Sequence, residues 1–333
     1  MSMKRVAACQ WYAFSNDQTD RREQGFQRNG GRITLKLAVV GSINIDQTVM
    51  ADRIPNKGET LPGHDLQFVP GGKGANQAVA MARLGAEVSM FGCVGNDDNG
   101  RRMVENLRAN GVDTEFVKTV DGIPTGIAII TVGDNDNTII VVAGANAAVD
   151  RSYIDSMKNR LLKYDMVVLQ HEIPLDTVHY VVDLCSEHHI PVVLNPAPAA
   201  GIPAEVIEKT TWITPNEHEA ALIFGTDRTM EELLLAYPEK LVITRGSKGV
   251  STALASGRIL HVPVRPAKVV DTSGAGDTLN GAFCFRIASG DTIEDALRYA
   301  NTAASLSTEK FGAQGGMPTA TEVKLALEKE EQP

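Results

Sequence analysis

Short apolar runs recur along most of the chain and alternate with segments whose apolar residues follow helical spacing. Runs this short and this continuously apolar are typical of strands in a parallel sheet that helices cover on both faces. They lie at residues 36–43, 165–170, 191–195, 211–214 and 241–244. The pattern therefore predicts an α/β fold with a mostly parallel central sheet and helices on both of its faces.

Two segments interrupt this alternation. Residues 47–68 hold prolines and glycines among short apolar pieces, and residues 123–142 hold two apolar runs around the turn at 134–137. Turn residues between short apolar runs favour hairpins over helices. We therefore expect two β insertions, at about 47–69 and 123–143, in a domain that spans residues 35–330.

Residues 1–34 lack hydrophobic periodicity and a continuous apolar stretch of the signal-peptide kind. We expect a disordered extension or a misassigned start codon, with a regulatory arm as the alternative. The net charge of −9 and the pI near 5.3 argue against nucleic-acid binding, which favours a basic face.

No apolar run reaches the length of a membrane span, so we expect no membrane partner. Four cysteines lack metal-type spacing, and we interpret them as reduced thiols of a cytoplasmic protein: Cys9, Cys93, Cys185 and Cys284.

The most informative stretch is Asp271–Phe283, in which a small-residue turn precedes a helical pattern. Residues 267–270, which are apolar except for Lys268, come before it and predict a strand. A helix N-terminus presents free N–H groups and a positive dipole end, and glycine lets an anion approach them. The turn Gly274–Gly276 is therefore a candidate anion site. Asp277, in the first helical turn, can take a proton from an attacking hydroxyl; alternatively, it is only a helix-capping acid.

Further polar residues follow other predicted strands, at the edge where open α/β sheets bind ligands. Asn44 and Asp46 follow the first strand, although such a pair is more often a turn. Glu172 lies just past the strand at 165–170. Lys73 lies in the glycine-rich sequence 71–74, which opens a helix predicted for Ala75–Leu84. This sequence is not a Walker A motif, because the chain holds no G-x-x-x-x-G-K-[ST].

Three motifs carry a family resemblance: DTSGAGDT at 271–278, GGKGANQA at 71–78 and TPNEHE at 214–219. Along the chain they follow one another as 71–78, 214–219 and 271–278, which is the family's order. From about Leu35 to the C-terminus, the chain resembles the ribokinase-like (PfkB carbohydrate kinase) family. The resemblance implies that the two β insertions pair into a small sheet that forms a lid over a sugar site, and that the protein is a homodimer through this lid. A lid would exclude water that competes with the sugar hydroxyl.

The resemblance also implies roles for individual residues. Those implied for the sugar are Asn44, Asp46, Gly72, Lys73, Asn76, Glu172 and Asp277. Those implied for ATP are Asn216, Glu219, Thr244, Gly246, Gly249, Gly276 and Asn301. Those implied for potassium, partly through backbone carbonyls, are Asp271, Ser273, Thr308, Phe311, Ala313 and Met317. Glu219 would hold Mg²⁺ through water, and Asn216 would cap a helix as well.

The implied activity is ATP-dependent phosphorylation of D-ribose at its 5-hydroxyl. Asp277 would act as the base, and the N–H groups of Gly274, Ala275 and Gly276 would stabilise charge on the phosphoryl group. The same chemistry on deoxyribose, a ketose or a nucleoside is the nearest alternative. A non-catalytic sugar-binding regulator is another, and the presence of Asp277 with both glycines weighs against it.

Overall fold

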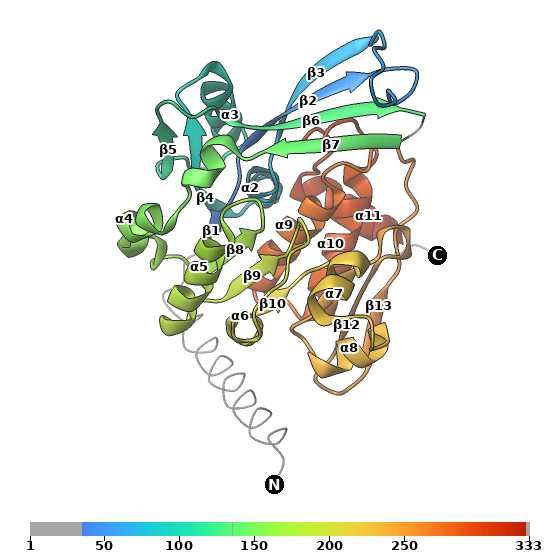
Figure 1. Cartoon of the computed structure of the whole chain (residues 1–333). Coiled ribbons are helices and arrows are strands. Elements are labelled where there is room, and N and C mark those ends of the chain that lie inside the picture. The colour runs from blue at the N-terminus through green and yellow to red at the C-terminus, as the bar shows by residue number, and fades with distance from the viewer. Residues whose placement is uncertain (1–34, 135, 331–333) are drawn as a thin grey trace. The chain divides into compact units, whose positions relative to one another are not determined.

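β1 (Lys36–Val40) is a central strand of the main sheet (Figure 1). It pairs in parallel with β4 on one side and β8 on the other. The sheet order is β10-β9-β8-β1-β4-β5, and its pairs are parallel. The other strands are Glu87–Gly95 (β4), Val117–Val120 (β5), Met166–Gln170 (β8), Val192–Asn195 (β9) and Trp212–Ile213 (β10). This computed structural model describes residues 35–134 and 136–330, so the expectation for residues 1–34 lies outside it.

Successive residues of β1 point into two different hydrophobic layers, as the alternation of a strand requires. Leu37 and Val39 belong to the cluster that contains the apolar residues of α2, α9 and α10. Ala38 and Val40 belong to the cluster that contains those of α4 and α5. The continuous apolar run of β1 is thus explained by burial on both faces, and the predicted α/β layering is confirmed.

The helices of these layers follow the strands along the chain. They are Lys73–Arg83 (α2), Asp98–Ala109 (α3), Arg151–Leu161 (α4), Leu175–Glu187 (α5), Ala204–Lys209 (α6), Glu217–Phe224 (α7), Met230–Ala236 (α8), Ala275–Ala288 (α9), Ile293–Ser307 (α10) and Ala320–Glu330 (α11). Two short 3₁₀ turns cover Gly144–Ala148 (η1) and Gly246–Lys248 (η2).

The two β insertions form a separate four-stranded sheet in the order β3-β2-β6-β7, seen at the top of Figure 1. Its strands are Asn44–Met50 (β2), Asp65–Gly71 (β3), Gly126–Gly133 (β6) and Asp136–Val142 (β7). Within each insertion the strands are antiparallel, whereas β2 and β6 join the insertions in parallel. We call this sheet the lid; the expected small second sheet is therefore present.

A third sheet contains β11 (Val242–Thr244), β12 (Val250–Ala253) and β13 (Ile259–Val262), paired antiparallel. Isolated parallel bridges link Ile213 to Leu241 and Asn216 to Thr244. The main sheet is thereby continued past β10, so that the ends of β10 and β11 lie side by side.

Two local predictions are wrong. Residues 267–270 do not form a strand, and Val269 and Val270 are 60% and 57% exposed. The backbone N–H of Val270 instead donates to the carbonyl of Thr308 at the end of α10, at 2.8 Å. In addition, β1 ends at Val40, and Asn44 already belongs to a lid strand. An apolar run shows that a segment can pair, but it does not show whether a partner strand is available.

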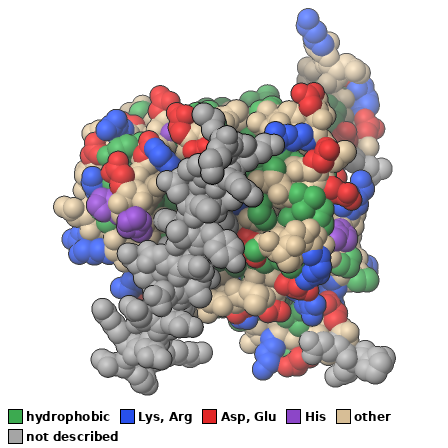
Figure 2. Space-filling model, turned by 90° about the horizontal axis from the view of Figure 1, so that it is seen from below, with side chains coloured by type: hydrophobic (Ala, Val, Ile, Leu, Met, Phe, Trp, Pro, Cys, Tyr) green, Lys and Arg blue, Asp and Glu red, His purple; other side chains and the backbone are tan. Residues whose placement is uncertain are grey.

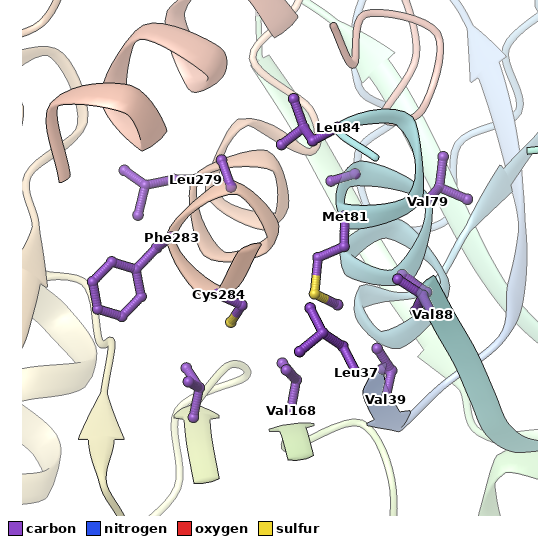
Figure 3. Close-up of a cluster of buried hydrophobic side chains, with 14 of the residues drawn as sticks. Leu37, Val39, Val79, Met81, Leu84, Val88, Val168, Leu279, Phe283 and Cys284 are labelled. Atoms are coloured by element: carbon purple, nitrogen blue, oxygen red, sulfur yellow. The ribbon is translucent and has the colours of Figure 1, made fainter. Parts of the chain in front are cut away.

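Helices α2 and α9 lie side by side on the main sheet (Figure 3). Figure 3 shows Met81 of α2 and Cys284 of α9 pointing toward the strands below them. Gly281 permits this close approach, because a Cβ there would lie 2.7 Å from the Cβ of Ala80 and 3.0 Å from the carbonyl oxygen of Gln77. Asp277 lies one turn before Gly281, so the same approach brings it to the start of α2.

Acidic and basic side chains are interspersed over the visible described part of the face shown in Figure 2, and no broad basic area is seen there. None of the helices in the described parts of the chain is long and apolar enough to cross a membrane.

Candidate active site

Asp277 lies in the first turn of α9 and is only 6% exposed. Its Oδ2 accepts a hydrogen bond from Nδ2 of Asn76 at 2.9 Å, and its Oδ1 accepts one from Nε2 of Gln77 at 3.0 Å. Both donors come from the first turn of α2. A carboxylate with a donor on each oxygen is held in one orientation and still has lone pairs for a ligand.

The turn before Asp277 has one closed side and one open side. Gly274 caps α9 with φ of 72°, and a Cβ there would lie 2.5 Å from the carbonyl oxygen of Ala313. A Cβ at Gly276 would meet nothing within 4 Å. The N–H of Ala275 donates to the carbonyl of Thr272 at 3.2 Å, so among the three residues of the proposed anion site its N–H is already engaged. Gly276 is therefore the residue whose backbone a ligand can approach most closely.

Glu172 and Lys73 meet at the N-terminus of α2. Oε2 of Glu172 accepts from the hydroxyl of Ser42 at 2.6 Å and from the backbone N–H of Lys73 at 3.0 Å. Burial acts to lower the pKa of the Lys73 ammonium, but the surrounding carboxylates, Asp277 foremost, raise it above its ordinary value. Lys73 therefore stays cationic and offers the site a positive charge.

Asn44 and Asp46 lie in β2 of the lid and not in a turn. Oδ1 of Asn44 accepts from Nδ2 of Asn146 at 2.6 Å, which leaves the Asn44 amide nitrogen as a donor. The Asp46 carboxylate lies against Gly71, where a Cβ would be 2.2 Å from its Oδ1.

The environment of Asp46 disfavours its charge. Burial, followed by the negative charges of Glu172 and Asp277, raises the pKa of Asp46 to about 7. An acceptor in such a site gains most from ligand hydroxyl groups, because these replace the water it has lost.

An open pocket connects this polar cluster with the edge of β10 and β11. The pocket is lined by Lys73, Asn195, Ala197, Asn216, Glu219, Thr244, Gly274, Gly276, Asp277 and Asn280. Of the residues implied for the sugar, Lys73 and Asp277 line this pocket, and of those implied for ATP, Asn216, Glu219, Thr244 and Gly276 line it.

Asn216 and Glu219 form a capping box at the start of α7. Oδ1 of Asn216 accepts from the Glu219 N–H, and Oε2 of Glu219 accepts from the Asn216 N–H, each at 2.8 Å. The capping role expected for Asn216 is therefore confirmed. Burial raises the pKa of Glu219 above its ordinary value, although the Asn216 N–H and the charge of Lys73 act to lower it. Oε1 of Glu219 takes no part in this capping box, so it can accept from water that binds a cation.

The remaining residues implied for the nucleotide lie in two places. Thr244 lines the pocket, and Gly246 and Gly249, with φ of 53° and 91°, form the turn after it. Asn301 is buried in α10, and its Nδ2 donates to the carbonyl of Pro263. The Asn301 amide thus anchors the segment that replaces the predicted strand.

The residues implied for potassium lie in two loops that touch each other. Oδ1 and Oδ2 of Asp271 accept from the N–H groups of Ser273 and Gly312, each at 2.8 Å. The Thr308 carbonyl accepts from both Val270 and Asp271. The Met317 carbonyl accepts from Arg83, so two of the implied carbonyls already have donors, whereas Phe311 is exposed at its surface.

Within residues 35–134 and 136–330, no group of three His, Cys, Asp or Glu side chains could by itself hold a metal ion. A divalent cation at this pocket would thus take most of its ligands from phosphate oxygens and water, which is the usual habit of Mg²⁺.

Several residues of the site were not singled out by sequence reasoning: Ser42, Gln77, Asn146, Gln170, Asn195 and Gln314. Gln77 stands inside the motif at 71–78, and Asn195 ends the predicted strand at 191–195. The position of Asn195 at the carboxyl end of a strand was a usable signal. The others gave none, because their partners lie far away in the chain.

A sequence profile of the pfkB family carbohydrate kinases matches residues 34–320. Ribokinase from Bacillus subtilis is 49% identical over 291 residues, which cover 87% of this chain and 99% of the relative. Ribokinase from Lactococcus lactis is 47% identical over 294 residues, which cover 88% and 97%. The solved structure of Arabidopsis thaliana ribokinase complexed with ribose and ATP is similar with a TM-score of 0.79 at 32% identity, over 89% of this chain and 99% of that chain.

The profile, the relatives and the shared architecture agree with the three motifs that meet in the pocket. The resemblance stated from those motifs is confirmed. This chain belongs to the pfkB family of carbohydrate kinases.

Proposed function

We propose that the protein is a ribokinase, which transfers the γ-phosphoryl group of ATP to the 5-hydroxyl of D-ribose. The observation that carries this proposal is the Asp277 carboxylate, buried at a helix N-terminus in a pocket that Lys73, Asn216 and Glu219 also line. The two bacterial relatives named above are ribokinases, and the plant structure holds ribose and ATP.

The polar set of the site suits a small polyol. The Asn44 amide nitrogen and Lys73 donate to sugar hydroxyls, Asp46 and Glu172 accept from them, and Asn76 has one N–H left after its bond to Asp277. The sugar is thereby fixed with its 5-hydroxyl at Asp277. Such positioning supplies much of the rate of phosphoryl transfer.

Asp277 then accepts the proton of the 5-hydroxyl while the oxygen of that hydroxyl attacks the γ-phosphorus. The bond between the γ-phosphorus and the β–γ bridging oxygen breaks, and ADP leaves. The positive end of α9 and the open backbone at Gly276 face the charge that develops on the phosphoryl oxygens. Asn216 and Glu219 lie on the nucleotide side, and Glu219 would hold Mg²⁺ through water. Bound with ATP, Mg²⁺ neutralises phosphate charge and orients the β- and γ-phosphates.

A direct test is an ATP-coupled assay with D-ribose, 2-deoxyribose, fructose and adenosine, followed by ³¹P NMR of the product. We expect D-ribose to give the highest kcat/KM and the product to carry phosphate on O5. A higher kcat/KM with any other acceptor, or phosphate on another oxygen, would contradict the proposal.

We also propose that K⁺ activates the enzyme. Asp271, Ser273 and Ala313 supply oxygen atoms beside Gly274, and carboxylate with carbonyl oxygens suits a large monovalent cation. Replacing Na⁺ by K⁺ at constant ionic strength should raise kcat/KM, because a cation there supports the turn that begins α9. Tetramethylammonium, which is too large for such a site, is the control. Equal rates in all three salts at subsaturating ribose would reject the site.

We propose a homodimer formed through the lid. All residues of β7 are exposed, including Ile139, Ile140, Val141 and Val142, and β7 is an edge strand of its sheet. An exposed apolar edge is a template for another strand. We expect light scattering to give a dimer mass for the wild type and a monomer mass for Ile140→Lys. Leu325→Lys, at an exposed apolar position in α11, should remain dimeric. A monomeric wild type would contradict this proposal.

We place the enzyme in the cytoplasm, since Cys93, Cys185 and Cys284 are buried free thiols. Cell fractionation followed by immunodetection tests this location, and recovery with the membrane or secreted fraction would refute it.

A further inference from the structure

Gln77 is fully buried next to Asp277, and all of its amide hydrogens have partners in the protein. Its Nε2 donates to Oδ1 of Asp277 at 3.0 Å and to Oδ1 of Asn195 at 3.2 Å. Its Oε1 accepts from Nε2 of Gln170 at 2.6 Å. A primary amide has two N–H donors, so Gln77 has none left for a substrate.

The hydrogen bonds of this network can be assigned donors and acceptors in only one way. An ionised Asp277 accepts and cannot donate, so the Gln77 nitrogen must face it, and the Gln77 oxygen must then face Gln170. Asn195 is fixed from behind, because its Nδ2 donates to the Thr214 carbonyl at 2.9 Å. Turning the Gln77 amide over would place an oxygen against a carboxylate.

Gln170 packs against Gly41. A Cβ at Gly41 would lie 2.2 Å from Oε1 of Gln170, so only glycine leaves room for this amide, whose Oε1 has no hydrogen-bond partner among the described residues. Gln170 is fully buried and ends β8, the strand next to β1. The orientation of Gln77 is therefore set by the rigid main sheet and not by a loop.

Asn76 differs from Gln77 in this respect. Its Nδ2 donates to Asp277 and its Oδ1 accepts from Gln314, which leaves one N–H free for a sugar hydroxyl. The two neighbouring amides thus divide two tasks: Asn76 faces both the base and the ligand, whereas Gln77 faces only the base and the protein.

We propose that Gln77 is a positioning residue that fixes the plane of the Asp277 carboxylate for proton transfer. This inference rests on the proposed role of Asp277 as the base. The terminal torsion of an aspartate is soft, so its carboxylate needs outside partners to hold one plane.

The test is Gln77→Met, which keeps the length of the side chain and removes both donors. We expect kcat to fall about tenfold, since misplaced catalytic groups lose rate steeply. KM for ribose and for ATP should stay within about threefold, because Gln77 does not reach either ligand.

Tyr153→Phe is the matched control for lost stability. It removes one buried hydrogen bond, from the Tyr153 hydroxyl to the Phe116 carbonyl at 2.6 Å, away from the pocket. It should lower Tm and leave kcat unchanged. If Gln77→Met does not fold, we expect Gln170→Met to lower kcat in the same way but by less. It removes the hydrogen bond that Gln170 donates to Oε1 of Gln77.

A double-mutant cycle separates this inference from the proposed function. In an Asp277→Asn background, Gln77→Met should have little further effect on kcat, since the carboxylate it positions is gone. An equal loss in both backgrounds, or an unchanged kcat in Gln77→Met, would overturn the positioning role and leave the proposed base intact. An active Asp277→Asn would instead overturn the proposed mechanism.

Discussion

Asp277→Asn should lower kcat by about 10²–10⁴, the usual loss when a general base is removed. The asparagine has nearly the same size and can still hydrogen-bond the 5-hydroxyl, but it cannot accept the proton. The loss should therefore be in kcat, whereas the affinities for ribose and for ATP, measured by calorimetry, should change little.

The structure adds a second expectation for this variant. Asp277 accepts from both Asn76 and Gln77, and an amide can accept from only one of them. We expect a loss of about 1–3 kcal/mol in the free energy of unfolding, the ordinary cost of a buried polar group left without its partner. Denaturant unfolding of the variant measures this loss separately from kcat.

Asp295→Asn is the matched control, because Asp295 is also an acid in the first turn of its helix. Asp295 lies in α10, is exposed and does not line the pocket. Its variant should keep kcat within about twofold, since it changes a surface charge at a helix end and keeps an oxygen that can accept from the Thr292 hydroxyl. If Asp277→Asn behaves like this control, Asp277 is a capping acid and not the base.

The second large effect concerns Asp46. Asp46→Asn should lower kcat/KM for ribose by about 10²-fold at pH 8, because hydrogen bonds to a charged acceptor contribute about 1.5–3 kcal/mol each. The loss should be smaller with 2-deoxyribose, which lacks one of the two neighbouring hydroxyls that Asp46 would accept from. Wild-type enzyme should therefore prefer ribose by at least about tenfold.

The pKa of about 7 at Asp46 gives this prediction a pH dependence. In the free enzyme the carboxyl is protonated below about pH 7, and sugar hydroxyls bind best to its ionised form. With saturating MgATP, kcat/KM for ribose should rise between about pH 6 and 8, and this rise should be absent in Asp46→Asn. A wild-type profile that is flat over this range would contradict the assignment.

The stability of the fold should depend on pH in the opposite direction to kcat/KM, and fall as the pH rises. The pKa of Asp46 is raised on folding, so the ionised carboxylate is the form that the fold disfavours. Its contribution to stability is present below the ordinary value of 3.8 and is lost as the pH rises through about 7. Ribose should restore part of this loss, and the rise in Tm with ribose should be larger at pH 8 than at pH 6.

Much of the fold could be predicted because its signals are local. The apolar runs that became β1, β8 and β9 are buried on both faces, and the small-residue turn before α9 sets the start of that helix. Residues 267–270 show the limit of this reasoning. They have the composition of a strand, but their neighbour is the end of α10, so they lie extended and exposed.

The site was predictable to the extent that it follows motifs. Asp277, Lys73, Glu219 and Thr244 were chosen from the sequence, and the structure brings them to one pocket. Asn44 and Asp46 were expected at the carboxyl end of the first strand, with a turn as the alternative, and instead lie in β2 of the lid. Their hydrogen-bonding capacity was readable from residue type, whereas their position depends on the pairing of β2 with β6.

By itself, the sequence determined which chemistry the chain can perform. The identity of Asp277, the glycines before it and the spacing of the three motifs are properties of short stretches, and so are the strands and helices that carry them. Only the tertiary structure decided how Asp277 is held. Its donors, Asn76 and Gln77, lie about two hundred residues earlier, and they reach it because Gly281 lets α9 approach α2. Contacts of this kind depend on how two helices pack on one sheet, and no local pattern specifies that.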